Sequence, residues 1–218
     1  DKVKKIFPDT AIYNAYGTTE AGAGTFGVHP EQIPKPQISL GYPAPGVEAR
    51  LVEDGNTDAR EGVLQLKTPA LMPGYLNLPE RTSQSVSVDG WYDTGDIMRR
   101  DNNGFYYFVG RADDMFICGG ENIYPGEVEK MLERHASIHQ ACVVPVEDSI
   151  RGAKPVAFIV ATPGSLITEQ DVKDFALKNA PPQQHPRNVE FLEYLPLAGT
   201  NKIDRNTLIE KAKIFVEI

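Results

Sequence analysis

The stretch from Gly110 to Gly126 reads GRADDMFICGGENIYPG and separates two parts of the sequence that have different patterns. Before it, short alternating runs separated by turn residues predict β-strands, whereas after it apolar runs alternate with segments of helical spacing. Inside it, the adjacent Gly119 and Gly120 indicate a turn that needs positive φ angles, or a backbone that a ligand approaches closely. We therefore expect a junction between two bodies in this stretch.

The part before the junction predicts a small antiparallel structure. Alternating apolar and polar residues at 46–52 and 62–67 indicate half-buried strands, and an aromatic run at 105–108 indicates another. Short strands at this spacing are typical of a small barrel or sandwich, here over residues 41–111. Further upstream, residues 11–15 predict a short strand.

The part after the junction predicts an α+β domain of about 100 residues, a usual size for a small domain. Thr168 predicts the start of one of its helices, because a carboxylate follows three residues later and the two side chains can satisfy free N–H groups. The expected segments are a helix at 124–135, strands at 140–146, 155–160 and 188–192, a helix after Thr168, and a last helix after Arg205.

The composition, 41% hydrophobic and 24% charged residues, is that of an ordinary soluble globular protein. A formal net charge of −8 disfavours nucleic acid or an anionic membrane as a partner. No apolar run is long enough to predict a membrane-spanning segment. Cys118 and Cys142 lie in apolar runs, so we expect two buried thiols and a reducing, cytoplasmic location. Because Asp1 opens what reads as mid-domain sequence, we expect a piece of a longer protein.

Three residues carry chemistry that a nucleotide site needs. Asp96, in a run with a second carboxylate, can accept two hydrogen bonds from the diol of a ribose; the run also fits a turn with solvated acids. Arg111 can hold a ribose oxygen or a phosphate, or form an ion pair with Asp113 or Asp114. Lys202, in a late loop, can meet a developing negative charge, or can lie on the surface as most lysines do.

The run from Tyr16 to Glu20 reads YGTTE and is followed closely by two glycines. Its threonine hydroxyls and free backbone N–H groups suit phosphate oxygens, and the carboxylate of Glu20 suits a hard cation such as Mg²⁺. The same residues also fit a turn with a helix cap. On these residues alone, both interpretations stay open.

Five motifs occur in order along the chain: YGTTE at 16–20, PGY at 73–75 with Thr82, YDTGD at 92–96, the stretch 110–125, and Lys202 in a late loop. In this order they resemble the C-terminal half of the adenylate-forming, or AMP-binding, enzymes. That family includes acyl- and aryl-CoA synthetases, peptide-synthetase adenylation domains and beetle luciferases. The resemblance spans nearly the whole chain.

The resemblance implies an α+β fold made of three parts. Residues 1–40 correspond to the end of a large N-terminal α/β domain, 41–111 to its antiparallel β-barrel subdomain, and 112–218 to a small mobile α+β domain. Asp113 matches the family's hinge position, about which the last domain is expected to swing between two half-reactions.

The resemblance also implies roles for the run at 16–20. Tyr16 would pack on the adenine of ATP, beside Gly17 and Thr18 in the nucleotide site. Thr19 would bind the α-phosphate, and Glu20 would hold Mg²⁺. These roles favour the phosphate-binding interpretation of the run over the plain turn.

Further along the chain, the resemblance implies that Asp96 and Arg111 bind the ribose hydroxyls. Lys202 would reach the carboxylate and α-phosphate oxygens during adenylation. The residue before it is Asn201, where many members have glycine; some CoA ligases of aromatic acids share the Asn-Lys pair.

The loop at 119–122 would serve the second half-reaction, in which the thiol of CoA takes the acyl group. Gly119 and Gly120 would line the path of the thiol, and Glu121 follows them. Domains that load a carrier protein usually have Arg-Ile-Glu where this chain has residues 121–123, Glu-Asn-Ile, which favours CoA.

The function implied is that of an ATP-dependent carboxylic acid–CoA ligase, which forms an acyl-adenylate and then a thioester with release of AMP and pyrophosphate. The acid is a fatty or an aromatic one. The alternatives are a domain that loads a carrier protein, a luciferase-type oxygenase, and a non-catalytic relative that acts as a binding module. Because the family's phosphate loop and acyl pocket lie upstream of Tyr16, we expect these 218 residues to be inactive alone.

Overall fold

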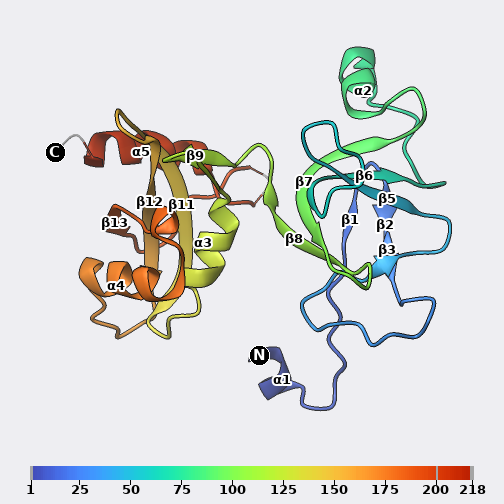
Figure 1. Ribbon diagram of the computed structural model, residues 1–218. Helices are drawn as coiled ribbons and strands as arrows, with labels where there is room; N and C mark the ends of the chain where they lie inside the picture. The colour runs from blue at the N-terminus through green and yellow to red at the C-terminus, as the bar shows by residue number, and fades with distance from the viewer. Residues whose placement is uncertain (1, 200, 217–218) are drawn as a thin grey trace. The chain divides into compact units, whose positions relative to one another are not determined.

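The structure, a computed structural model, describes residues 2–199 and 201–216. The chain divides into two compact units, Asp1–Ala112 and Asp113–Ile218, which are taken in turn (Figure 1). The boundary falls directly before Asp113, whose role as a hinge stays a prediction. Within the described part of the chain, no helix is long and apolar enough to cross a membrane.

The first unit contains a four-stranded antiparallel sheet in the order β5-β6-β7-β8. The strands are β5 (Glu48–Val52), β6 (Glu61–Lys67), β7 (Tyr92–Arg100) and β8 (Tyr106–Arg111). Buried and half-buried residues alternate along β6, with Leu64 and Leu66 fully buried, as in a strand that packs one face on a core. The strands expected in this region are therefore present.

This sheet is open, in contrast to the barrel that the sequence predicts. In the described residues, β5 and β8 are the outer strands and no backbone ladder joins them. The free edge of β8 is already occupied: Leu40 N–H donates to the Tyr106 carbonyl at 2.8 Å, and Tyr106 N–H donates to the Gly41 carbonyl at 3.0 Å. Because these groups are paired, β5 cannot pair with the backbone of Tyr106 at that end of β8.

The remaining elements of the first unit are short: α1 (Lys2–Ile6), the strand pairs β1 (Gly17–Thr18) with β2 (Gly22–Ala23) and β3 (Phe26–Gly27) with β4 (Tyr42–Pro43), and α2 (Pro79–Ser85). The strand predicted at 11–15 is absent. Ile12 is 45% and Tyr13 76% exposed, and the Asn14 carbonyl accepts from the Lys35 ammonium at 2.7 Å. A strand needs backbone partners and burial, and this segment has a side-chain partner and solvent instead.

The second unit is α+β, as predicted. Its sheet has the order β10-β9-β12-β11, and β13 pairs with β12 in parallel. The strands are β9 (Phe116–Cys118), β10 (Glu121–Ile123), β11 (Ile138–Asp148), β12 (Gly152–Ala161) and β13 (Asn188–Phe191); the helices are α3 (Pro125–Leu132), α4 (Glu169–Asn179), η1 (Pro182–Gln184) and α5 (Arg205–Val216).

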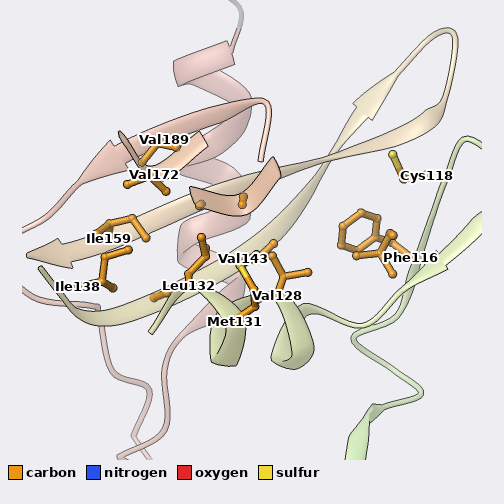
Figure 2. Packing of buried hydrophobic residues seen from close by; sticks show 14 residues of the cluster. Phe116, Cys118, Val128, Met131, Leu132, Ile138, Val143, Ile159, Val172 and Val189 are labelled. Carbon is orange, nitrogen blue, oxygen red and sulfur yellow. The ribbon is translucent and has the colours of Figure 1, made fainter. Parts of the chain in front are cut away.

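Both faces of this sheet are covered, and the side chains of β11 and β12 alternate between two cores. Val143 and Ile159 pack in one cluster with residues of α3 and α4, and Figure 2 shows Val128 and Leu132 projecting from α3 into it. Cys142 and its neighbours on the other face pack in a second cluster with residues of α5. Burial on both faces explains the continuous apolar runs in the sequence.

Local signals set the ends of the helices. The capping box at the start of α4 is confirmed: the Thr168 hydroxyl accepts from Asp171 N–H at 3.2 Å, and the Asp171 carboxylate accepts from Thr168 N–H at 2.9 Å. The helix predicted at 124–135 ends earlier, at Leu132. The side chain of the next residue, Glu133, accepts a hydrogen bond from Ala141 N–H of β11 at 3.2 Å, which ties the end of the helix to the sheet.

Candidate active site

Asp96 and Arg111 meet at the paired ends of β7 and β8. They are direct partners in the antiparallel register, and Arg111 Nη1 lies 3.0 Å from Asp96 Oδ1. The other oxygen of Asp96 accepts a hydrogen bond from the Tyr16 hydroxyl. Tyr16 and Asp96 are 80 positions apart in the sequence, and together with Arg111 they form one network that we call the Asp96 network (Tyr16, Asp96 and Arg111).

The turn before Asp96 holds this network in place. Gly95 has φ of 66°, and a Cβ added there would lie 3.0 Å from Arg111 Nη2, so a side chain would push the guanidinium aside. Thr94 donates from its hydroxyl to the Leu64 carbonyl at 2.9 Å and accepts from Asp96 N–H at 3.0 Å. No local pattern predicts this role of Thr94, because its main partner lies 30 residues away.

The two carboxylates of the YDTGD run have different environments. Asp93 Oδ1 accepts from Gly95 N–H at 3.0 Å, which is a local turn contact. Asp96 is only 7% exposed, so the alternative of two solvated acids is wrong for this residue. Burial and the neighbouring Asp96 carboxylate raise the pKa of Tyr16, which keeps its hydroxyl protonated as the donor to Asp96.

The YGTTE run forms a tight turn between β1 and β2, with Gly17 opposite Ala23 in the ladder. The Thr18 hydroxyl accepts from Ala21 N–H at 3.0 Å, which confirms the turn, although a strand pair and not a helix follows it. Thr19 is exposed at the tip. Its hydroxyl is therefore placed where a ligand could reach it.

Glu20 is held by two tyrosines of other segments. The Tyr75 hydroxyl donates to Glu20 Oε1 at 2.9 Å, and Arg81 stacks on the ring of Tyr75 at 4.5 Å. Burial alone would raise the pKa of Glu20, but hydrogen bonds from Tyr75, from its own backbone and from Tyr92 hold that pKa below its ordinary value of 4.5. An ionised, oriented carboxylate fits a Mg²⁺ ligand.

Thr82 supports Tyr75 from α2. Its hydroxyl accepts from Tyr75 N–H at 2.9 Å and donates to the Leu78 carbonyl at 3.1 Å. The sequence marked Tyr75 and Thr82 only as parts of a motif, without a role. Their role becomes visible only in the hydrogen bond between Tyr75 and Glu20, which are 55 residues apart in the sequence.

Gly119 and Gly120 form the two-residue turn of the β9–β10 hairpin. Cys118 pairs with Glu121 across the turn, and the two glycines have φ of 63° and 88°. Positive φ at both central residues is typical of a type I′ turn, which favours glycine or asparagine. Added Cβ atoms would meet nothing within 4 Å, so the turn alone accounts for both glycines.

Lys202 lies exposed in a tight loop before α5. Leu197 and Ile203 form a bridge at the base of the loop, and Ala198 N–H donates to the Lys202 carbonyl at 2.7 Å. Asn201 has φ of 61°, a left-handed conformation that asparagine tolerates and that glycine, the residue of many family members, adopts freely.

The residues near the junction also find partners. Asp114, one of the two partners considered for Arg111, lies 3.6 Å from Arg205 Nε. Asp113 is exposed at the start of the second unit. The Asp96 network and Glu20 thus belong to the first unit, and Asp113, the glycine turn and Lys202 to the second.

Two family models match the chain: the AMP-binding enzyme model at residues 1–76, and the AMP-binding enzyme C-terminal domain model at residues 127–202. The two matched regions occur in the order that the motifs predict. The chain therefore belongs to the AMP-binding, or adenylate-forming, enzyme family.

Several curated relatives are CoA ligases. "4-coumarate--CoA ligase-like 6" of Oryza sativa subsp. japonica is 32% identical over 211 residues, which is 95% of this chain and 35% of the relative. "Long-chain-fatty-acid--CoA ligase" of Bacillus subtilis is 36% identical over 204 residues, 92% of this chain and 36% of the relative. The chain thus spans well under half the length of either relative.

Solved structures agree on the fold. The structure of the amide bond synthetase McbA from Marinactinospora thermotolerans superposes with a TM-score of 0.81 at 29% identity. The match covers 91% of this chain and 41% of that one. The chain therefore shares its fold with that synthetase over most of its length.

Proposed function

We propose that the protein to which this chain belongs is an AMP-forming carboxylic acid–CoA ligase. The observation that carries the proposal is the Asp96 network, in which a buried carboxylate and a guanidinium lie 3.0 Å apart at paired strand ends. Such a pair can hold the two hydroxyls of a ribose, and here it lies in a chain whose relatives are CoA ligases.

In the first half-reaction, an oxygen of the acid attacks the α-phosphorus of ATP, and the bond to pyrophosphate breaks. We assign Asp96 and Arg111 to the ribose, Tyr16 with Gly17 and Thr18 to the adenine side, and Thr19 to the α-phosphate. These residues orient the nucleotide so that the reacting atoms approach in line. The exposed Thr19 hydroxyl supports the phosphate assignment.

Two charges complete this step. We assign Lys202 to the carboxylate and α-phosphate oxygens, where its ammonium offsets the charge that builds in the transition state. We assign Glu20 to Mg²⁺, which when bound neutralises phosphate charge. The hydrogen bond from Tyr75 to one Glu20 oxygen leaves the carboxylate ionised and oriented for such a ligand.

In the second half-reaction, the thiolate of CoA attacks the acyl carbonyl carbon, and AMP leaves with the electrons of the acyl–oxygen bond. We propose that the second unit swings about Asp113, so that the turn at Gly119, Gly120 and Glu121 replaces Lys202 in the site. One body can then supply two sets of groups in turn. We place the enzyme in the cytoplasm, because Cys118 and Cys142 are both buried free thiols.

A second candidate uses a different acceptor. The solved structure of McbA is that of an amide bond synthetase, so an amine in place of CoA is the alternative for the second step. A carrier protein is a third acceptor, which the Glu-Asn-Ile sequence at 121–123 disfavours. The acid itself, fatty or aromatic, is bound by residues outside the network described.

The test uses the full-length protein, because the chain spans 35% and 36% of the two CoA ligases compared and we expect it to be inactive alone. Pyrophosphate release is measured with a panel of fatty and aromatic acids, with CoA, an amine or a carrier protein as the acceptor. We expect release that depends on CoA. Release that requires an amine or a carrier protein instead would replace the ligase assignment.

Lys202→Ala separates the two half-reactions. We expect adenylation to fall by roughly 100- to 1,000-fold, the scale for removing one charge-stabilising group, while thioester formation from a supplied acyl-adenylate continues. Lys178→Ala, an exposed lysine of α4, is the matched control and should change neither step. Equal losses in both steps would contradict the role of Lys202.

A further inference from the structure

The guanidinium of Arg205 joins four segments of the second unit. Arg205 is the first residue of α5, and its Nη2 donates to Glu129 Oε2 of α3 at 2.9 Å. Its Nη1 donates to the Val143 carbonyl of β11 at 3.0 Å. On the remaining side, its Nε lies 3.6 Å from Asp114 Oδ2, directly after the predicted pivot.

The acceptors in this cluster are arranged to suit a planar guanidinium group with several N–H donors. Glu129 Oε1 also accepts from Val143 N–H at 2.8 Å, so carboxylate, strand and guanidinium form a closed set of hydrogen bonds. The side chains of Glu129 and Arg205 are 13% and 26% exposed, so water screens their interaction only in part. A lysine has one nitrogen and cannot reach three partners in these directions.

The same residue anchors the loop that carries Lys202. The base of the loop is closed by the Leu197–Ile203 bridge and by the hydrogen bond from Ala198 N–H to the Lys202 carbonyl. Arg205 N–H donates to the Ile203 carbonyl at 3.1 Å, which joins the end of the loop to the start of α5. The direction of the loop therefore depends on how Arg205 is held.

We propose that Arg205 is a positioning residue that fixes the Lys202 loop relative to Asp114. When the second unit rotates about Asp113, Lys202 then moves together with Asp114 as one rigid part. The proposal rests on the proposed function, since it needs Lys202 to act in adenylation. Asp113 and Asp114 are adjacent, and Arg205 is three residues after Lys202. One side chain thus spans the short distance between the pivot and the loop.

Precise placement matters for adenylation because a displacement of about 1 Å far from the chemistry can cost on the order of 100-fold in rate. The second half-reaction does not use Lys202. Weakening the link should therefore slow the first step selectively, whereas a loss of folding would slow both.

The sharpest variant is Asp114→Asn in the full-length protein. It removes the charge next to the pivot and leaves Arg205 paired with Glu129, so no buried charge is stranded. We expect kcat for adenylation to fall roughly 10-fold with the KM for ATP unchanged, as expected when a group is misplaced and ground-state binding is intact. Thioester formation from a supplied acyl-adenylate and the thermal unfolding midpoint should match the unaltered protein.

Arg205→Lys is the second variant, and it should show the same selectivity with a larger loss. Combined with Asp114→Asn, it should add little further loss, because both changes break one link. Lys213→Gln is the matched control: it lies on the same helix and loses an exposed ion pair with Glu210 at 2.7 Å, so both half-reactions should be unchanged.

Two results would overturn the proposal. One is an Asp114→Asn protein whose adenylation rate is unchanged, and the other is an equal loss in both half-reactions for Asp114→Asn. The Lys202→Ala result distinguishes a failure of the positioning role from a failure of the proposed function. If Lys202→Ala is selective and Asp114→Asn is not, only the positioning role fails; if Lys202→Ala spares adenylation, the proposed function fails first.

Discussion

Asp96 and Arg111 are direct cross-strand partners, and a 3.0 Å ion pair joins their side chains. Asp96 is also fixed by the Tyr16 hydroxyl, and Arg111 Nη1 by the Thr94 carbonyl at 2.9 Å. Groups that are oriented before a ligand arrives lose little conformational entropy on binding it. The network is therefore already oriented for the ribose diol that we propose it binds.

Asp96→Asn should weaken nucleotide binding. The amide cannot accept at both positions from Tyr16, Arg111 and a ribose, so we expect the KM for ATP to rise about 10-fold or more, the scale for a hydrogen bond to a charged group. The measurement is the ATP dependence of pyrophosphate release. Asp93→Asn is the control, since Asp93 makes a turn contact with Gly95, and a similar KM change there would contradict the assignment.

Tyr75→Phe should change how stability depends on pH. The pKa of Glu20 is lowered in the folded protein, so its contribution is complete above the ordinary value of 4.5 and is lost as pH falls through the folded-state pKa. Without the Tyr75 hydroxyl, the free energy of unfolding should fall by about 1 kcal/mol near neutral pH and by less in acid.

Urea unfolding of the full-length protein at neutral and acid pH checks this. Tyr194→Phe, a highly exposed tyrosine of the second unit, is the control and should leave stability unchanged at both pH values. A Tyr75→Phe loss of the same size at both pH values would show that Glu20 is not the partner that matters. We also expect half-maximal activity to need a higher Mg²⁺ concentration, because a less oriented Glu20 would bind the ion more weakly.

Asp113→Pro should separate the half-reactions in the opposite sense to Lys202→Ala. Proline fixes φ near −65° and removes the backbone freedom that a pivot requires. We expect adenylation to persist and thioester formation to be lost, as measured with acid and ATP and then with a supplied acyl-adenylate and CoA. Asp113→Ala keeps the backbone free and should retain both steps; normal CoA transfer in Asp113→Pro would rule out this pivot.

Substitutions at Gly119 can test its role in the turn separately from its proposed role in the path of the thiol. Gly119→Asn suits a type I′ turn, whereas Gly119→Ala must adopt a left-handed conformation that costs about 1–2 kcal/mol. If the thiol passes here, both variants should slow the CoA step, and only the alanine should lower stability. A Gly119→Asn protein with full CoA transfer would assign the glycine to the turn alone.

Local patterns predicted much of the fold. The alternation along 62–67, the capping box at Thr168 and the apolar runs of β11 and β12 each specify their own segment, and the structure contains all of them. The features that the local patterns did not predict depend on partners distant in the sequence. In the described residues no ladder joins β5 to β8, and residues 40–41 pair with Tyr106 of β8, which no pattern within 41–111 indicates.

The site was predictable as residues but not as contacts. Tyr16 and Asp96 were both singled out, yet their hydrogen bond crosses 80 positions, and that from Tyr75 to Glu20 crosses 55. The sequence predicts Arg205 only as the start of a helix, because its acceptors lie on α3, β11 and the junction. A single sequence carries no information on such pairings. The order and spacing of the motifs, in contrast, are enough to indicate the family.

The two native cysteines have a practical consequence for testing the proposed rotation of the second unit. Both are buried, and burial raises the pKa of Cys142 to about 12, so little of it is thiolate at neutral pH. A cysteine introduced at the exposed Lys213 should therefore react with a maleimide dye ahead of both. A fluorescence reporter of domain rotation can then be attached without first removing the native thiols.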